Sequence, residues 1–111
     1  MSDLRVDVSG KRASTVVALT GDVDLSTAGY LRERLNAIAA SGVTDVVVDL
    51  RDASFLDGTG LGILLGGIQR LSSGGHVTLR SPPPEVRELI DLTTPELQAT
   101  ISIEPSPPAT A

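Results

Sequence analysis

Hydrophobic and polar residues alternate at the start of the chain and predict a β-hairpin. Leu4, Val6 and Val8 are separated by polar residues, a two-residue period that is typical of a half-buried strand. Residues 9–12 have the composition of a turn, and the β-branched run at 15–20 predicts a second, more deeply buried strand. We therefore expect these two strands to pair with each other.

The next segment changes to a helical period. Residues 21–24 are expected to end the second strand, and Ser26 is placed to cap a helix because its hydroxyl can accept a hydrogen bond from an orphan amide. Apolar residues recur at helical spacing from Ala28 to Ile38, and Gly42 suits the left-handed position that follows many helices. The pattern predicts a first helix that ends at this glycine.

A second strand and helix form the clearest pattern in the chain. Residues 46–50 are apolar on both faces, which is typical of a central parallel strand. Asp57 is placed to cap the helix that follows, in which leucines and isoleucines recur at intervals of three and four from Leu61 to Leu71. Residues 72–75 are rich in serine and glycine and are expected to end this helix.

The C-terminal part predicts two further elements of the sheet and one more helix. Residues 77–79 indicate a short strand, and Pro84 suits the first turn of a third helix. Residues 101–103 alternate between apolar and polar side chains and predict a last strand. Residues 105–111 contain three prolines among seven residues, so we expect a disordered Pro-rich tail.

This order of elements, β-β-α-β-α-β-α-β, predicts an α/β fold. Strands that alternate with helices imply a mainly parallel sheet of four or five strands with right-handed crossovers, and the N-terminal hairpin adds an antiparallel edge. The chain has 111 residues, of which 41% are hydrophobic, and fits one domain. We assign that domain to residues 1–104 and the tail to residues 105–111.

Composition and charge exclude several classes of function. The net charge of −5, with Lys11 as the only lysine, repels phosphate backbones, and two aromatic residues provide no platform for stacking bases. The absence of cysteine excludes disulfides, thiolate catalysis and Cys-type zinc sites. No signal peptide is evident, and the longest apolar stretch, 61–68, is too short for a membrane span. We expect a cytoplasmic protein that binds neither nucleic acid nor membranes.

The segment 56–62 is the best candidate for a functional site. It follows a buried strand and enters a helix, which is where open parallel sheets place their sites. Glycine within a helix costs about 1 kcal/mol relative to alanine. We interpret Gly60 and Gly62 as a surface that a partner approaches closely, whereas for Gly66 and Gly67 close packing within the fold and a functional reason are equally open.

Established enzyme and cofactor motifs do not fit this segment. The spacing departs from the dinucleotide-binding fingerprint because Ile63 stands at its third glycine, and no Gly-Lys-Ser/Thr triplet of a phosphate-binding loop occurs. The nucleophile motif G-x-S-x-G is absent, and His76, the only histidine, is expected at the start of a strand. We expect no enzyme activity and no cofactor.

Metal binding is a weaker possibility at the same place. Asp22 and Asp24 precede the first helix, and together with Asp57 they could in principle contact a cation, since carboxylate oxygens are ligands for hard cations. No cluster of ligands with a recognised metal-site spacing is visible, so we assign no metal site.

Three segments together resemble a known family. Residues 46–62 show an aliphatic strand followed by Phe, an aliphatic residue, Asp, a small residue, a hydroxyl residue and Gly-Leu-Gly. Residues 19–28 fit a pattern L-x-G-[ED]-[LVI]-D before a helix, and residues 84–93 give a weaker third match. These segments resemble STAS domains, most of all the stand-alone anti-sigma-factor antagonists. The resemblance covers residues 4 to about 104 and implies the STAS fold.

The resemblance also implies a mechanism. In this family the hydroxyl two residues after the motif's Asp, which is Thr59 here, is phosphorylated by the cognate anti-sigma factor, a serine/threonine kinase that holds the ATP. The unphosphorylated antagonist binds the anti-sigma factor and frees the sigma factor, the phosphorylated form dissociates, and a phosphatase resets the switch. The implied role is regulation of transcription, as in stress responses. Gly58 stands where such antagonists often carry serine.

We expect the partner to bind around the first two of these motifs. The predicted partner-binding residues are Asp22, Asp24, Ser26, Asp57, Gly58, Thr59, Gly60, Leu61, Gly62 and Leu65. Two alternative functions stay open. The first is a STAS docking subunit of a transporter or signalling scaffold that is not switched. The second is a small-molecule or nucleotide binder, against which stands the lack of a nucleotide-specific loop.

Overall fold

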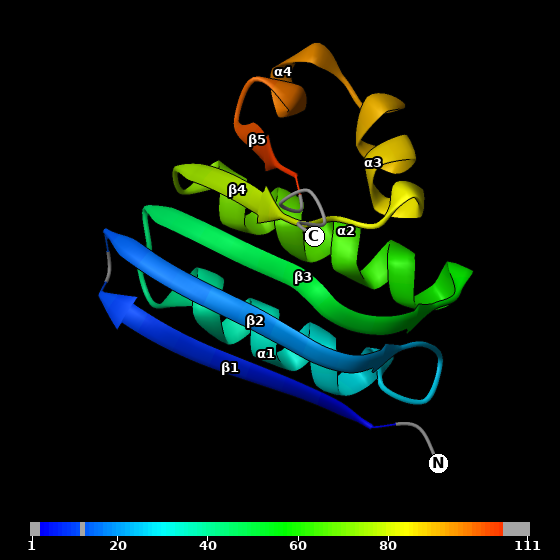
Figure 1. Cartoon of the computed structure of the whole chain (residues 1–111). Helices are drawn as coiled ribbons and strands as arrows, with labels where there is room; N and C mark the ends of the chain where they lie inside the picture. The colour runs from blue at the N-terminus through cyan, green and yellow to red at the C-terminus, as the bar shows by residue number, and fades with distance from the viewer. Residues whose placement is uncertain (1–2, 12, 106–111) are drawn as a thin grey trace, which may run out of the picture.

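The computed structural model describes residues 3–11 and 13–105, and its order of elements confirms the predicted one with a single addition (Figure 1). The elements are β1 (Leu4–Lys11), β2 (Ser14–Val23), α1 (Ala28–Ala40), β3 (Asp45–Leu56), α2 (Gly58–Ser73), β4 (His76–Arg80), α3 (Pro84–Asp91), α4 (Pro95–Gln98) and β5 (Ile101–Glu104). The addition is α4, a single turn. Apart from Pro105, the predicted tail lies outside the described residues.

The strands form one five-stranded sheet in the order β1-β2-β3-β4-β5. Only β1 and β2 pair antiparallel, as the hairpin pattern predicts, and the other neighbours are parallel. Figure 1 shows α1 and α2 side by side on one face of this sheet, with α3 beside α2. Because successive parallel strands point the same way, the N-termini of α1 and α2 lie at the same edge of the sheet.

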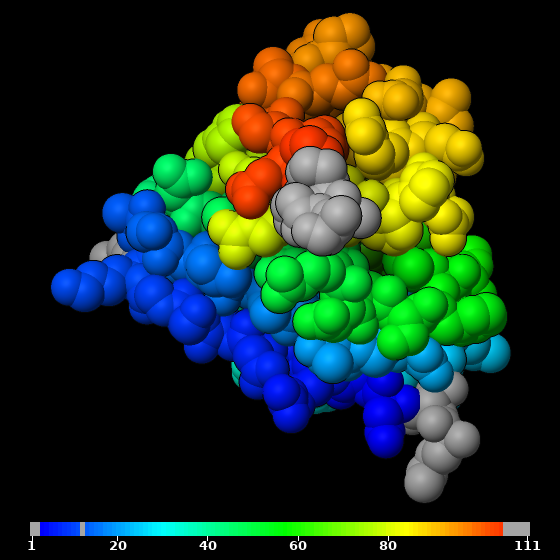
Figure 2. Space-filling model, viewed as in Figure 1, coloured from blue at the N-terminus to red at the C-terminus, as the bar shows by residue number. Residues whose placement is uncertain are grey.

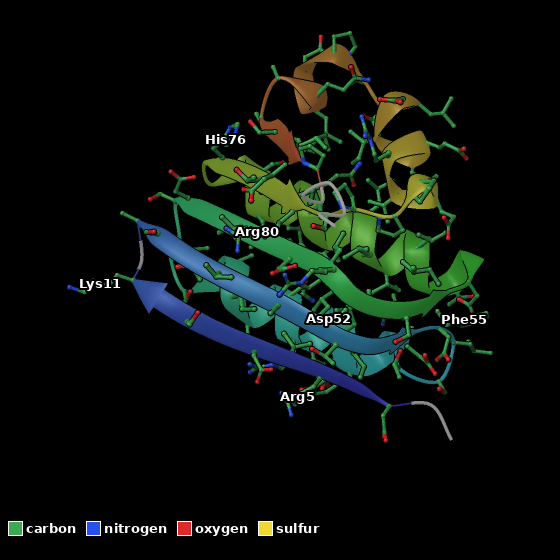
Figure 3. The ribbon with its side chains drawn as sticks, in the orientation of Figure 1. Arg5, Lys11, Asp52, Phe55, His76 and Arg80 are labelled. Carbon is green, nitrogen blue, oxygen red and sulfur yellow. The ribbon has the colours of Figure 1, made fainter. Side chains whose placement is uncertain are left out.

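Alternation along the strands separates a buried face from an open one. Val17, Val48 and Leu79 lie in register on neighbouring strands and are fully buried beneath the helices. On the opposite face Arg80 forms ion pairs with Glu104 at 3.0 Å and with Asp49 at 3.8 Å (Figure 3). The prediction that 46–50 is apolar on both faces is therefore wrong at its fourth residue, whose carboxylate lies on the open face.

Two strands extend beyond their predicted ends. Residues 21–24 were expected to stop β2, but β2 continues to Val23, and β3 continues to Leu56. The two strands continue because they still pair beyond the predicted ends. Gly21 is in register with Ala53 and Val23 with Leu56, although the pairing there is irregular. Gly21 has a φ of 109°, and a Cβ there would lie 2.2 Å from the carbonyl oxygen of Asp3. Both the backbone conformation and the close approach of Asp3 therefore require glycine at this position.

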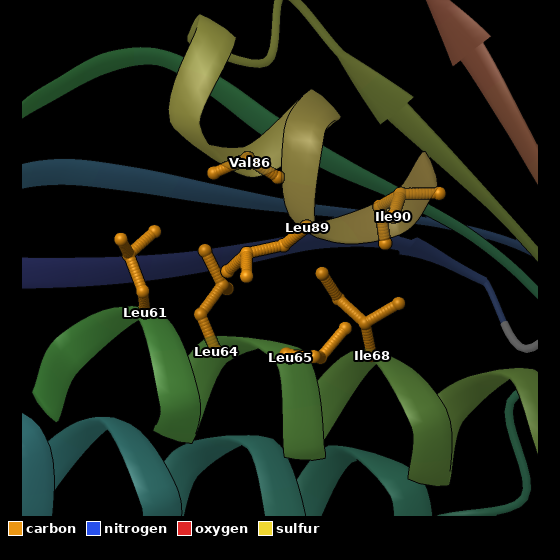
Figure 4. Close-up of a pocket in the computed structure, with 7 residues that line it drawn as sticks. All are labelled: Leu61, Leu64, Leu65, Ile68, Val86, Leu89 and Ile90. Atoms are coloured by element: carbon orange, nitrogen blue, oxygen red, sulfur yellow. The ribbon is translucent and has the colours of Figure 1, made fainter. Parts of the chain in front are cut away.

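Close packing joins the helices to each other. A Cβ on Gly67 would lie 2.3 Å from Cδ1 of Leu35, so this glycine is explained by the contact between α2 and α1. The other side of α2 packs against α3, where Leu61, Leu64, Leu65 and Ile68 point toward Val86, Leu89 and Ile90 (Figure 4). In the described ranges, no helix combines the length and apolar character that crossing a membrane requires.

Candidate functional site

Asp57 connects the two segments that form the candidate site. Its Oδ1 accepts a hydrogen bond from the backbone N–H of Gly60 at 2.8 Å, which caps α2 as predicted. Its Oδ2 accepts from the N–H of Leu25 at 3.1 Å, and its own N–H donates to the carbonyl of Val23 at 3.2 Å. One carboxylate therefore fixes the β2–α1 loop against the first turn of α2.

A second carboxylate organises the β2–α1 loop itself. Oδ1 of Asp24 accepts from the N–H of Ser26 at 2.9 Å, from its hydroxyl at 2.7 Å and from the N–H of Thr27 at 3.2 Å. The predicted cap at Ser26 is wrong, because its hydroxyl donates to this carboxylate while α1 begins at Ala28 with Thr27 at the cap position. The Thr27 hydroxyl donates to the carbonyl of Asp22 at 2.8 Å and closes the loop.

The carboxylates of this edge do not form a metal site. Among residues 3–11 and 13–105, no three His, Asp or Glu side chains are grouped so that they could hold a metal ion. Asp24 and Asp57 use their oxygens to accept backbone N–H bonds instead. The possibility of a shared cation with Asp22 is therefore not supported.

Thr59 is exposed in the first turn of α2. Within the described part of the chain, its hydroxyl makes no hydrogen bond, and the N–H groups of Gly58 and Thr59 have no backbone partner. Free N–H groups at the start of a helix carry partial positive charge. The site thus presents an unbonded hydroxyl beside two backbone N–H groups that can donate hydrogen bonds to a negatively charged group and stabilise it.

The glycines of this segment have two different explanations. Gly60 is buried, and a Cβ there would lie 2.2 Å from the carbonyl oxygen of Val23 and 2.9 Å from the nitrogen of Asp24. Its missing side chain is required by the fold, so the interpretation of Gly60 as a bare partner surface is not needed. Gly58 and Gly62 are exposed, and a Cβ at either would meet no atom within 4 Å. The fold gives no reason for glycine at these two positions.

Two predicted partner-binding residues also serve the fold. Leu61 and Leu65 are half-buried and line the seam between α2 and α3 (Figure 4). Their side chains are only partly available to a partner. Their role in partner binding stays a prediction.

Sequence reasoning missed two apolar side chains at this edge. Leu25 is 72% exposed and Phe55 is 54% exposed. Together with Asp24, Ser26 and Asp57 they line one shallow hollow of about 410 Å³. Figure 2 shows the β3–α2 segment (green) and the β2–α1 loop (cyan) as one continuous surface at the right of the molecule. A leucine among the polar residues of a predicted loop was the available signal.

The fold and this helix entrance define a STAS domain. A family model described as "Mlab, STAS domain" matches residues 6–94. The chain therefore belongs to the STAS domain family, which confirms the fold expected from the sequence. The family and the relatives described next are regulatory binding proteins, and the chain is not an enzyme.

Curated relatives place the chain among the antagonists within that family. It is 32% identical over 92 residues to the anti-sigma-B factor antagonist of Bacillus subtilis (strain 168), a match that covers 82% of this chain and 84% of that protein. It is 27% identical over 93 residues to the anti-sigma F factor antagonist of Paenibacillus polymyxa, with 82% and 80% covered. The resemblance inferred from the sequence motifs is confirmed.

Solved structures of anti-sigma factor antagonists have the same fold as this chain. An anti-sigma factor antagonist from Mycobacterium paratuberculosis has a TM-score of 0.72 at 27% identity, covering 94% of this chain and 87% of that chain. SpoIIAA in its unphosphorylated form has a TM-score of 0.70 at 20% identity, covering 95% and 90%. SpoIIAA in its phosphorylated form scores 0.68 at 21% identity, covering 91% and 90%. At these identities the two SpoIIAA structures support the fold alone.

Proposed function

We propose that this protein is an anti-sigma-factor antagonist that binds an anti-sigma factor of the serine/threonine kinase type and thereby releases a sigma factor. Phosphorylation of Thr59 by that partner, which holds the ATP, switches binding off, and a phosphatase restores it. The observation that carries the proposal is the exposed, unbonded hydroxyl of Thr59 at a helix entrance that Asp57 holds in place. A switch on transcription acts in the cytoplasm, so this location is part of the proposal.

The fold can accept a phosphate at this position. The modification adds a charge of about −1.5 to −2, and the Thr59 hydroxyl has no hydrogen bond within the described residues that it would lose. The free N–H groups at the start of α2 favour negative charge by about 0.3–1 kcal/mol. The neighbouring carboxylate of Asp57 opposes it. These opposing contributions leave the stability of the domain nearly unchanged.

A docked partner cannot accept the same phosphate. Transfer from ATP breaks the bond between the γ-phosphorus and its bridging oxygen, forms a bond from Oγ1 of Thr59 to that phosphorus, and leaves ADP on the partner. The hydroxyl proton passes to a base of the kinase. The new phosphate then faces the remaining phosphates of the nucleotide within a desolvated interface. Burying such a charge without a partner costs several kcal/mol, so the complex dissociates.

The bare positions beside Thr59 are in line with close docking. Gly62 gives up about 1 kcal/mol of helix stability, and Gly58 presents no side chain at the first position of α2, although packing requires glycine at neither position. A partner backbone or nucleotide that approaches the first turns of α2 would require them. This reason also supports the rest of the predicted surface, from Asp22 and Ser26 to Leu65, as the binding face.

Intact-mass analysis tests the switch. The protein is incubated with ATP and each purified anti-sigma-factor kinase of its host, and the mass of one added phosphoryl group is expected. Thr59→Ala should abolish the addition and still bind the kinase, whereas Thr44→Ala, which alters an exposed threonine before β3, should behave as wild type. The proposal is rejected if no kinase modifies the wild type or if the addition persists in Thr59→Ala.

A second candidate function is a docking subunit that is not switched. It is favoured by the matching family model, which is described by the Mlab protein rather than by an antagonist, and by Gly58, which replaces the serine frequent in antagonists. Such a subunit would bind a membrane-transport ATPase or a signalling scaffold permanently. Affinity purification separates the two functions, since recovery of a soluble kinase supports the switch and recovery of a membrane-transport ATPase supports the permanent docking subunit.

A further inference from the structure

Two large apolar side chains stand exposed beside the phosphorylation site. Across residues 3–11 and 13–105, the exposed large hydrophobic residues are Val8, Leu25, Tyr30, Phe55 and Leu92. Leu25 and Phe55 come from segments about 30 positions apart and line the same hollow of about 410 Å³. Figure 3 shows Phe55 at the end of the sheet where β2 passes into the loop before α1. Their meeting at one place is a property of the fold.

The hollow is held in shape before any partner arrives. The N–H of Leu25 is bound by Asp57, and the next residue, Ser26, is bound twice by Asp24. Phe55 belongs to β3, whose last paired residue, Leu56, is in register with Val23 of β2. Side chains on a fixed backbone lose less freedom on binding, so they are efficient anchors for a partner.

The charge around the hollow is of one sign. Two of the five residues that line the hollow, Asp24 and Asp57, are carboxylates, and none of the five is lysine or arginine. Asp22, at the end of β2 and two residues before Asp24, adds a third carboxylate close to the hollow. A partner surface that complements this edge combines apolar side chains with arginine or lysine.

We infer that Leu25 and Phe55 are the apolar anchors for the anti-sigma factor, which fills the hollow with an apolar side chain ringed by basic residues. The inference rests on the proposed function, because it names the chemistry of the partner at that site. Anchors of this kind dominate the affinity of an interface, while the surrounding polar contacts contribute little each. Thr59 is presented to the kinase by the same docking event, since Asp57 links it to the loop that carries Leu25.

Calorimetry with the purified anti-sigma factors of the host and a non-hydrolysable ATP analogue tests this inference. Leu25→Ser and Phe55→Ser should each lower the affinity at least tenfold and their combination more, at unchanged thermal stability because both side chains are exposed. Leu92→Ser is the matched control, because Leu92 is 83% exposed at the end of α3, away from the hollow. Asp22→Asn and added salt should each weaken binding, as a basic partner surface requires.

Three results overturn the inference, and they differ in what else they affect. If Leu25→Ser and Phe55→Ser bind within twofold of wild type while Thr59→Glu does not bind, the anchors are wrong and the proposed function stands. If the wild type binds none of the anti-sigma factors, the proposed function fails together with the anchors. If both serine variants abolish self-association in sedimentation and leave partner affinity unchanged, the hollow serves a second copy of the chain instead.

Discussion

A methyl group added to Gly60 would collide with the backbone of the β2–α1 loop. In Gly60→Ala the new Cβ would lie 2.2 Å from the carbonyl oxygen of Val23, whereas ordinary contacts begin near 3.4 Å, so the loop or the helix must move by about 1.2 Å. That movement disrupts the hydrogen bond from Asp57 to Val23 and the cap bond from Gly60 to Asp57. Both bonds belong to the connection that holds Thr59 in place.

The expected loss of stability follows from these contacts. Overpacking costs about 1–3 kcal/mol, and each weakened hydrogen bond costs about 1 kcal/mol. Replacing a helical glycine by alanine returns about 1 kcal/mol. The net expectation for Gly60→Ala is a loss of about 2–4 kcal/mol, a large part of the stability of a domain of this size. Such a loss lowers the melting temperature by roughly 10 °C.

Gly62→Ala is the matched control, because Gly62 follows Gly60 by two residues and lies on an exposed side of α2. No atom lies within 4 Å of its added Cβ, so only the helix propensity changes and stability should rise by about 0.5–1 kcal/mol. Urea unfolding followed by circular dichroism measures both variants. If Gly60→Ala is as stable as wild type, the close contact between α2 and the β2–α1 loop is not as described. Under the proposed function, Gly62→Ala should bind the anti-sigma factor more weakly in spite of its greater stability.

Three further predictions concern single contacts. Asp57→Ala removes the acceptor of two backbone N–H groups and should lower the free energy of unfolding by about 1–3 kcal/mol in urea titrations; a change below 0.5 kcal/mol would contradict the bridging role. Thr59→Glu should unfold within about 0.5 kcal/mol of wild type, as an exposed residue near a helix start does, yet bind an anti-sigma factor at least tenfold more weakly by calorimetry; normal binding would argue against the switch. Ser81 has a φ of 52°, a region that costs a side chain about 1–2 kcal/mol, so Ser81→Gly should be more stable by up to about 1 kcal/mol and Ser81→Val less stable than wild type; the reverse order in thermal unfolding would refute this.

The sequence predicts the order and type of the main elements because their periodicity is local. The alternation at the start of the chain and the leucine spacing of α2 each require a short window and no knowledge of neighbours. The extra turn α4 was missed although its signals were present, since Thr94 caps it and Pro95 occupies its first position. A four-residue helix has too few positions for a hydrophobic period to be visible.

Features that depend on distant pairing could not be predicted from local pattern. β2 and β3 extend past their predicted ends because Gly21 pairs with Ala53 and Val23 with Leu56, contacts that no short window contains. The predicted cap at Ser26 was wrong for a local reason, because its hydroxyl donates to the carboxylate of Asp24 two residues earlier and α1 begins at Ala28. The pairing of β2 with β3 places the β2–α1 loop next to the start of α2, where the site lies.

The exposure of two apolar side chains also could not be predicted from the sequence. Leu25 and Phe55 belong to residue types that usually pack inside, and only the end of the sheet leaves them without cover. The cap at Asp57 was predicted correctly, and the place of Thr59 in the first turn of α2 follows from it. The steric reason for glycine at position 60 could not be predicted, because it depends on the β2–α1 loop that packs against α2.

The carboxylate of Asp57 joins a loop and a helix that lie 32 residues apart in the chain. A kinase that selects its target by reading a linear stretch around a hydroxyl would find only half of this surface in residues 54–64. A synthetic peptide of that stretch would carry the acceptor without the loop beside it and should be a poor substrate. Under the proposed function, a kinase that contacts both the loop and the helix recognises only the folded domain. A misfolded copy would then neither be phosphorylated nor compete for the partner.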